Sequence, residues 1–228
     1  MLLKKWEDIP DFMKNDKVKI YYDILNKKRF GLFLKRIFDI IMSFLLCVLL
    51  SPVFVAIAIW IKLDSSGPVF YRQKRITQYG KEFKIFKFRT MVVNADKIGS
   101  LVTTQNDSRI TKVGKKIRKC RLDEIPQLFN ILSGDMSFVG TRPEVKKYVE
   151  QYTDEMKATL LLPAGVTSLA SINYKDEDEI ISKYVNQLHS VDEIYIKKVL
   201  PEKMKYNLEY IDQFKLIYDI KICIKTIS

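Results

Sequence analysis

The sequence predicts a small α+β domain that is mostly helical, with one β-hairpin and a re-entrant membrane helix–break–helix near its N-terminus. Three observations favour this fold class. A long apolar segment covers residues 37–61, two strand-like runs flank a turn at 78–80, and helical spacing of apolar residues marks the second half. We therefore expect an N-terminal extension (1–34), a membrane hairpin (35–62), a main domain (63–200) and a C-terminal amphipathic helix (201–228).

The apolar segment has the length and composition of a membrane helix. Its 25 residues, Ile37 to Ile61, contain a single charge, Asp39. A straight helix of this length would measure roughly 37 Å, against about 30 Å for a bilayer core. However, Ser51-Pro52 interrupts the run, and both flanks are rich in Lys and Arg, which favours the cytoplasmic side for both. We therefore favour a re-entrant hairpin with its break at Ser51-Pro52; a proline-kinked span is the alternative.

Two strands follow the membrane segment. Pro68 to Arg72 and Lys81 to Arg89 flank the turn Gln78-Tyr79-Gly80. The second run interleaves aromatic and basic residues, which fits a nucleic-acid face, a basic edge facing phosphates or lipid headgroups, or a solvated cationic face. A turn at 106–111 then leads into a basic helix, Lys112 to Lys119.

The rest of the chain is predicted from apolar spacing and breakers. Residues 144–162 have helical spacing, 163–165 break it, and Val166 to Tyr174 is a candidate short strand. The acidic run 176–179 is typical of a solvated helix start rather than a metal site. Pro201 opens a final helix, whose apolar stripe suits either the core or a membrane interface.

Composition limits the functional classes. The chain has 228 residues and 39 Lys+Arg against 27 Asp+Glu, a net charge of +12, which indicates an anionic partner such as nucleic acid, acidic lipid or a phosphorylated substrate. Three scattered cysteines indicate neither disulfides nor a zinc site. Because His189 is the only histidine, mechanisms built on a Ser-His-Asp or Cys-His arrangement have little support.

The candidate chemistry lies at Asp123-Glu124. Pro126 follows two residues after Glu124 and is tolerated in the first turn of a helix, so the two carboxylates lie at or near a helix N-terminus, where anions are favoured. Taken alone, the pair is typical of an acidic helix cap. Basic residues on both sides, with Arg118 before the pair and Arg142 after it, favour instead a site that holds a polyphosphate beside an acid.

Several segments together resemble a known family. They are KRIFDI (35–40), the Ser51-Pro52 break, GPVFYRQKR (67–75), FKIFKFRTM (83–91), DSRITKVGKKIRK (107–119) and RLDEIPQLFNILSGDMSFVGTRP (121–143). In this order they resemble the bacterial sugar transferases called monotopic phosphoglycosyl transferases, which begin surface glycan assembly on a lipid carrier.

The resemblance implies a reaction and a set of roles. The donor would be a UDP-sugar, the acceptor polyprenyl (undecaprenyl) phosphate, and the products UMP and a polyprenyl diphosphate-linked sugar. Asp123 matches the nucleophilic aspartate and Glu124 the glutamate associated with Mg²⁺, with Asp123 as its neighbour at the metal. The phosphate-binding positions would be Arg89, Arg118, Gln127 and Arg142.

The same resemblance implies a place in the cell. The main domain would be catalytic and would lie on the cytoplasmic face of the bacterial inner membrane, in contact with membrane lipid. It would catalyse the first membrane step in making an O-antigen, capsule, exopolysaccharide or glycoprotein glycan. Nucleic acid is not an expected partner, and the sequence leaves open whether the chain forms a homodimer.

The chain departs from the usual family pattern in two motifs and one extension. The common Gly-Pro-Arg-Pro turn is Gly-Thr-Arg-Pro at 140–143, and the segment 163–177 lacks the usual tryptophan, so it is a candidate for sugar choice. The N-terminal 34 residues exceed the minimal form. Two rival hypotheses remain: a membrane-tethered basic module that binds acidic lipid or nucleic acid, and a purely structural scaffold in a glycan assembly complex. The first gives no reason for Asp123-Glu124.

Overall fold

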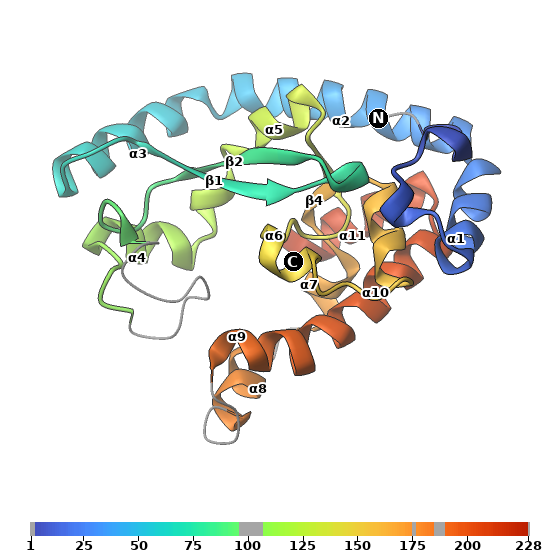
Figure 1. Ribbon diagram of the computed structural model, residues 1–228. Helices are drawn as coiled ribbons and strands as arrows, with labels where there is room; N and C mark the ends of the chain where they lie inside the picture. The colour runs from blue at the N-terminus through green and yellow to red at the C-terminus, as the bar shows by residue number, and fades with distance from the viewer. Residues whose placement is uncertain (1–2, 96–106, 175–176, 185–189, 228) are drawn as a thin grey trace.

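Two helices, α2 (Arg29–Leu49) and α3 (Ser51–Asp64), run along one edge of the molecule and meet at a bend (Figure 1). The structure, a computed structural model, describes residues 3–95, 107–174, 177–184 and 190–227. The predicted break is present: α3 begins at Ser51-Pro52, and the Ser51 hydroxyl donates to the Val48 carbonyl at 2.8 Å. The helices are bent by 61°; within the described residues no single helix is long and apolar enough to cross a bilayer, although this pair together is.

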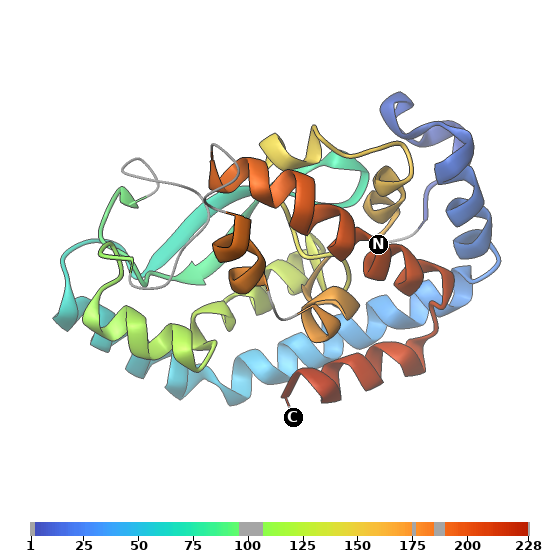
Figure 2. The same ribbon diagram turned by 90° about the horizontal axis from the view of Figure 1, so that it is seen from below.

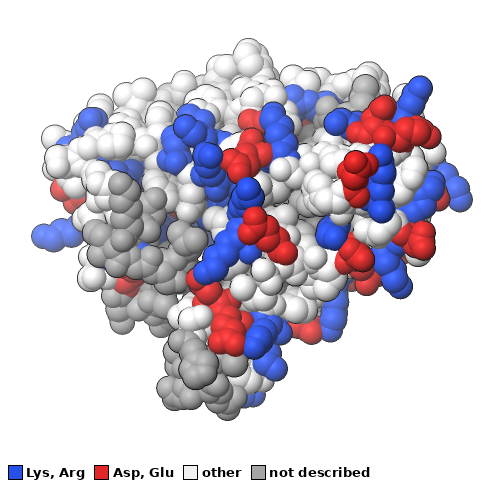
Figure 3. Space-filling view, in the orientation of Figure 1, with Lys and Arg blue, Asp and Glu red and all other residues white. Residues whose placement is uncertain are grey.

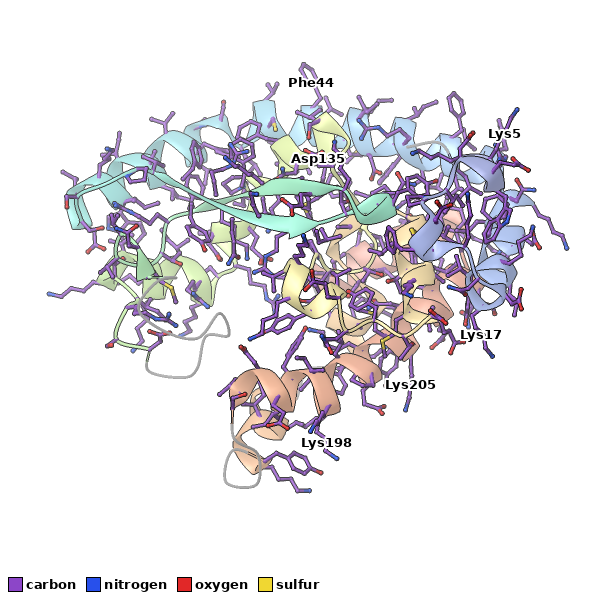
Figure 4. All side chains as sticks on the ribbon, viewed as in Figure 1. Lys5, Lys17, Phe44, Asp135, Lys198 and Lys205 are labelled. Atoms are coloured by element: carbon purple, nitrogen blue, oxygen red, sulfur yellow. The ribbon has the colours of Figure 1, made fainter. Side chains whose placement is uncertain are left out.

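Helix α2 has one buried polar face and one exposed apolar face. Lys35, Asp39 and Ser43 follow one another at intervals of four residues, so they lie on the same side, and all three are buried against the domain. The opposite side carries the exposed residues Phe30, Phe33, Ile37, Ile41, Phe44 and Val48, and Leu45 and Leu49 are exposed near the C-terminal end of the helix. Phe44 points away from the molecule in Figure 4 and is 58% exposed. In Figure 3 this edge is mostly free of charged atoms.

The predicted hairpin is confirmed. Strands β1 (Phe70–Ile76) and β2 (Glu82–Phe88) pair antiparallel across the turn η3 (Gln78–Gly80). Phe83, Ile85 and Phe88 are buried, and the Arg72 guanidinium lies 3.4 Å from the centre of the Phe86 ring. The aromatic residues of β2 therefore pack against the protein instead of forming an exposed stacking surface for nucleic-acid bases.

A second pair of strands lies in the core. The strand predicted over 166–174 is present only in part, because it begins at Ala164 and ends at Thr167. β3 (Met136–Val139) and β4 (Ala164–Thr167) are parallel, and Gly140 and Gly165 bring their backbones too close for a side chain at either position. The chain then forms helix α7 (Leu169–Asn173), because the Ser168 hydroxyl accepts a hydrogen bond from Ser171 N at 2.9 Å and caps it.

The predicted helix over 144–162 is shorter and broken. It consists of α6 (Lys146–Val149) and the 3₁₀ turn η6 (Met156–Leu161), which together form part of the connection from β3 to β4. Parallel strands need such a crossover.

The predicted final helix is two helices. α10 (Leu200–Asp212) and α11 (Leu216–Ile227) are separated by a short turn, which lets α11 fold back along α2 and β3 (Figure 2). Before them come α8 (Glu177–Tyr184), α9 (Val191–Ile194) and the π-helical turn η7 (Tyr195–Val199). The first residue of the acidic run, at 176, and the histidine at 189 lie outside the described residues.

The N-terminal segment is part of the core. The turns η1 (Trp6–Asp8) and η2 (Asp11–Met13) and helix α1 (Asp16–Asn26) bury Leu3, Ile9, Met13, Val18, Tyr22 and Leu25. These side chains share one hydrophobic cluster with α10 and η6. The extension therefore contributes to the fold of the main domain.

Candidate active site

The two candidate carboxylates lie on a tight turn between two helices. The predicted basic helix α4 (Lys112–Lys119) is present, and Arg121 then adopts a left-handed conformation with φ of 53°. This conformation costs a non-glycine residue roughly 1–2 kcal/mol, and it redirects the chain into the 3₁₀ turn η5 (Leu122–Glu124). Helix α5 (Gln127–Ser133) follows after Pro126. The pair thus precedes a helix start, as the sequence predicts.

Glu124 is held by two cations. Its Oε1 accepts from Lys87 Nζ at 2.8 Å and from Arg142 Nη2, and its Oε2 accepts from Arg142 Nη1 at 3.3 Å. Lys87 comes from β2 and Arg142 from the turn after β3, so three separate segments meet at this carboxylate. We call Lys87, Glu124 and Arg142 the ion triad. Because the Glu124 side chain is only 12% exposed, these contacts are shielded from solvent.

Asp123 differs from its neighbour because no cationic side chain among the described residues forms an ion pair with it. Burial raises the pKa of Asp123, and Lys87 opposes this effect. At Glu124 burial acts in the same direction, but Arg142 and Lys87 outweigh it and hold the pKa well below its ordinary value. Two adjacent carboxylates therefore have opposite pKa shifts, a pattern that often separates two chemical roles.

A large basic pocket opens beside the pair. Its volume is about 880 Å³, within the range of small-molecule sites. Glu124, Arg118, Arg121 and Arg142 line it, although Asp123 itself does not. The other lining residues come from the end of α2 and the bend that follows it, from Arg75 of β1, from Ile125 and the start of α5, from Phe138 of β3, from the segments 143–148, 166–174 and 195–203, and from the end of α11. The structure thus brings Arg118 and Arg142 to one cavity with Glu124.

Two predicted phosphate contacts lie elsewhere. Arg89 is buried, and its guanidinium donates to the carbonyls of Ser65 and Ser66, which shapes the turn between α3 and β1. Gln127 is 1% exposed, and neither atom of its amide has a hydrogen-bond partner among the described residues. Neither residue lines the pocket. Their role at the phosphates stays a prediction.

Sequence analysis did not identify Lys87 as a site residue. Phe83, Ile85 and Lys87 alternate along β2 and so share one face of the strand. A lysine that shares a strand face with buried apolar residues needs a carboxylate partner. The alternation of Phe83, Ile85 and Lys87 is visible in the sequence and could have identified Lys87. It did not identify Glu144 and Tyr195 either, which lie in the pocket joined by a hydrogen bond of 2.5 Å.

The donor set suits Mg²⁺ in its chemistry. Mg²⁺ prefers carboxylate oxygens, and one or two of them suffice when substrate phosphates complete the coordination. Asp123 has no ion-pair partner among the described residues, and Glu124 Oε2 carries only the 3.3 Å contact from Arg142. Within those residues there is no group of three or more Asp, Glu, His or Cys side chains that could hold a metal. A metal here would therefore depend on this pair and on substrate.

Comparison with known proteins identifies the family. The bacterial sugar transferase family model matches residues 30–228. The chain belongs to the bacterial sugar transferase family. The match begins one residue into α2 and includes the helix pair, the ion triad and α11, so it covers every element of the site described above.

Several curated relatives share this region. A UDP-glucose:undecaprenyl-phosphate glucose-1-phosphate transferase of Escherichia coli is 38% identical over 199 residues, covering 85% of this chain and 39% of the relative. An Aeromonas hydrophila UDP-N-acetylgalactosamine-undecaprenyl-phosphate N-acetylgalactosaminephosphotransferase is 35% identical over 198 residues, covering 86% and 43%. A Salmonella typhimurium undecaprenyl-phosphate galactose phosphotransferase is 38% identical over 166 residues, covering 66% and 34%. The chain thus spans less than half the length of these relatives.

Proposed function

We propose that this sugar transferase moves a sugar 1-phosphate from a UDP-sugar to undecaprenyl phosphate or a similar polyprenyl phosphate. The observation that carries the proposal is the arrangement at 123–124. Asp123 is half-buried and has no ion pair among the described residues, whereas its neighbour Glu124 is held by two cations and lines a basic pocket of about 880 Å³. The named relatives all act on undecaprenyl phosphate with different sugars, which supports the reaction class and leaves the sugar open.

The proposed chemistry divides the transfer into two displacements. An Asp123 carboxylate oxygen attacks the phosphorus that bears the sugar, forming an O–P bond, while the bond to the bridging oxygen breaks and UMP leaves with the electron pair. An oxygen of the acceptor phosphate then attacks the same phosphorus, and the bonding electrons return to the Asp123 carboxylate. The acceptor phosphate needs no added base, because it is already anionic at neutral pH.

The neighbouring residues hold the reacting groups. Arg118 and Arg142 line the pocket and are placed to bind the donor phosphates. Arg142 and Lys87 keep Glu124 ionised, and Lys87 opposes the rise that burial causes in the pKa of Asp123, which favours the nucleophilic form. Glu124, with Asp123 as its neighbour, would hold Mg²⁺. That ion would supply positive charge against the phosphate oxygens.

The decisive experiment measures the first displacement alone. The protein is mixed with Mg²⁺ and each UDP-sugar of a panel, without acceptor, and its intact mass and the released UMP are determined. We expect about one UMP per active enzyme and a sugar-phosphate adduct on Asp123. Asp123→Asn should give neither, whereas Asp11→Asn, at a side chain that is 95% exposed and remote from the pocket, should behave as wild type.

The outcome distinguishes two mechanisms. A preparation that turns over fully once acceptor is added, but that forms neither adduct nor UMP before, would contradict the covalent step. Direct attack by the acceptor would then be the mechanism, with Asp123 as a base or metal ligand. Absence of turnover with every UDP-sugar and polyprenyl phosphate would contradict the proposed function itself.

We also propose that the bent pair α2–α3 enters the cytoplasmic leaflet of the bacterial inner membrane and returns to the same face. The exposed apolar side of α2 and the basic flanks support this placement. Single cysteines introduced near Lys28 and Lys62, in a background without the native cysteines, should both resist an impermeant thiol reagent in intact cells. Labelling of only one of them from outside would establish a span.

A further inference from the structure

The pocket contains a basic group that the donor chemistry does not use, at the end of the C-terminal helix. Lys225 and Thr226 of α11 line it together with Leu46 and Leu50 at the end of α2. These residues are far in sequence from the ion triad, and most of them are uncharged, whereas every member of the triad is charged. Arginines line the pocket wall near Glu124, whereas the lining contributed by α11 and the end of α2 includes one lysine and two partly buried leucines.

Helix α11 is fixed at both ends. Near its start, Asp219 accepts from Lys35 Nζ at 2.5 Å and from the Tyr210 hydroxyl at 2.8 Å, and the Lys35 and Asp219 side chains are 1% and 2% exposed. Near its end, the hydroxyl oxygens of Thr226 and Thr167 lie 2.8 Å apart. Since Thr167 belongs to β4, the last turn of α11 is held against the strand pair β3–β4, and Arg142 lies in the turn that follows β3.

The outer side of α11 suits a membrane edge. Ile217 and Ile224 are 59% and 62% exposed, and both Lys221 and Lys225 are exposed beside them. Helix α11 also packs along α2, whose outer face is apolar (Figure 2). A helix with exposed isoleucines and lysines is typical of one that lies at the level of lipid headgroups. Lys225 therefore belongs both to the pocket and to this surface.

We propose that Lys225 receives the phosphate of the polyprenyl acceptor, while Leu46 and Leu50 contact the first part of its hydrocarbon chain. This inference rests on the proposed function. The acceptor carries a phosphate on a long apolar chain, so its site needs a cation beside an apolar surface at headgroup depth. No carboxylate among the described residues forms an ion pair with Lys225, so its ammonium group is available. A lysine is a flexible point charge, which suits a phosphate that must move toward the phosphorus on Asp123.

The test separates acceptor binding from donor binding. Full-length wild type, Lys225→Ala, Lys225→Arg and the matched control Lys221→Ala are assayed in detergent micelles without anionic phospholipid, with polyprenyl phosphate and UDP-sugar varied in turn. Lys225→Ala should raise the KM for polyprenyl phosphate roughly tenfold, as expected for loss of one charge-assisted contact, with the KM for donor unchanged. Lys225→Arg should recover most of the loss. Lys221→Ala removes the same charge one turn earlier, at a residue outside the pocket lining, and should match wild type.

Binding to vesicles tests the alternative that Lys225 contacts the phosphates of lipid headgroups. If Lys225 contacts lipid headgroups instead, Lys225→Ala will weaken binding to anionic vesicles and leave the KM for polyprenyl phosphate in micelles unchanged, which would overturn the proposal. An equal rise in KM for Lys221→Ala would also overturn it, because the effect would then be one of general charge. Wild type that is inactive with all donors and acceptors would overturn the proposed function and this role together.

Discussion

The ion triad predicts an order of stability among its variants. Glu124→Gln keeps the shape of the side chain but removes the charge of the carboxylate that pairs with both Lys87 and Arg142, whose side chains are only 23% and 34% exposed. Removing one partner of a fully buried pair costs about 3–5 kcal/mol, and partial exposure reduces this to roughly 2–3 kcal/mol. Lys87→Met loses one charge-assisted hydrogen bond of 2.8 Å but also removes the cost of burying an ammonium group, so we expect about 1 kcal/mol.

Thermal and urea unfolding in detergent measure these differences. For a chain of this size, 1 kcal/mol lowers the melting temperature by roughly 2–4 °C, so Glu124→Gln should lower it by roughly 4–12 °C and Lys87→Met by roughly 2–4 °C. The double variant should cost less than the sum, because each change removes the same contact. Lys84→Met is the matched control: Lys84 lies on the same strand with its side chain exposed, and we expect less than about 0.5 kcal/mol.

The pH dependence supplies an independent check on the same variants. Because the folded pKa of Glu124 lies below its ordinary value of 4.5, its ionised form contributes stability above that pH and loses it as the pH falls further. The difference in unfolding free energy between wild type and Glu124→Gln should therefore shrink below about pH 4.5. If the losses of unfolding free energy in Glu124→Gln and Lys87→Met add up in the double variant, the two residues are not coupled. The same conclusion follows if Lys87→Met and Lys84→Met lower the unfolding free energy equally.

Three further predictions concern other parts of the molecule. Burial raises the pKa of Asp123 and Lys87 opposes this rise, so the rate of UMP release should decrease with falling pH at a pH above 3.8, the ordinary pKa of an aspartate. Lys87→Met removes the opposing charge and should shift this decrease to a higher pH. Lys35→Met leaves the buried Asp219 carboxylate with the Tyr210 hydroxyl as its one side-chain donor among the described residues, so the free energy of unfolding measured in urea should decrease by about 3 kcal/mol or more. Met13→Ala, at a fully buried position of the N-terminal segment, should cost about 2–5 kcal/mol, whereas the exposed Lys17→Ala should be near neutral.

Local patterns were sufficient where one signal determined the structure. The break at Ser51-Pro52 followed from the loss of a backbone hydrogen bond at proline, and the Ser51 hydroxyl bonds to a carbonyl of the preceding turn, as expected. The hairpin and the helix from Lys112 to Lys119 followed from turn residues and periodicity. The family resemblance, which comparison with known proteins confirms, rested on segments that are contiguous in sequence.

Local sequence patterns gave wrong element boundaries where contacts between distant segments determine the structure. The apolar stripe from Leu208 to Ile227 has helical spacing throughout, but the buried Lys35–Asp219 pair requires α11 to fold back along α2, so the helix breaks at 213–215. Val166 to Tyr174 has a strand-like start, and the hydroxyl of Ser168 ends it by capping a helix. The role of the N-terminal segment was not predictable, because its buried residues meet partners more than a hundred positions away.

The two candidate carboxylates have different surroundings because they lie on a 3₁₀ turn. With three residues per turn, neighbours point about 120° apart, so Asp123 and Glu124 cannot both face the same pair of cations. Glu124 faces Lys87 and Arg142, which arrive from β2 and from the turn after β3, and its charge is neutralised there. Asp123 is left without an ion pair among the described residues, in surroundings that raise its pKa through burial. A carboxylate in that state gains most from attack on an electrophile such as phosphorus, because forming the new bond removes a poorly solvated charge. The left-handed Arg121 redirects the chain into this turn, directly before the two carboxylates, of which Glu124 is paired with two cations and Asp123 has no ion pair among the described residues.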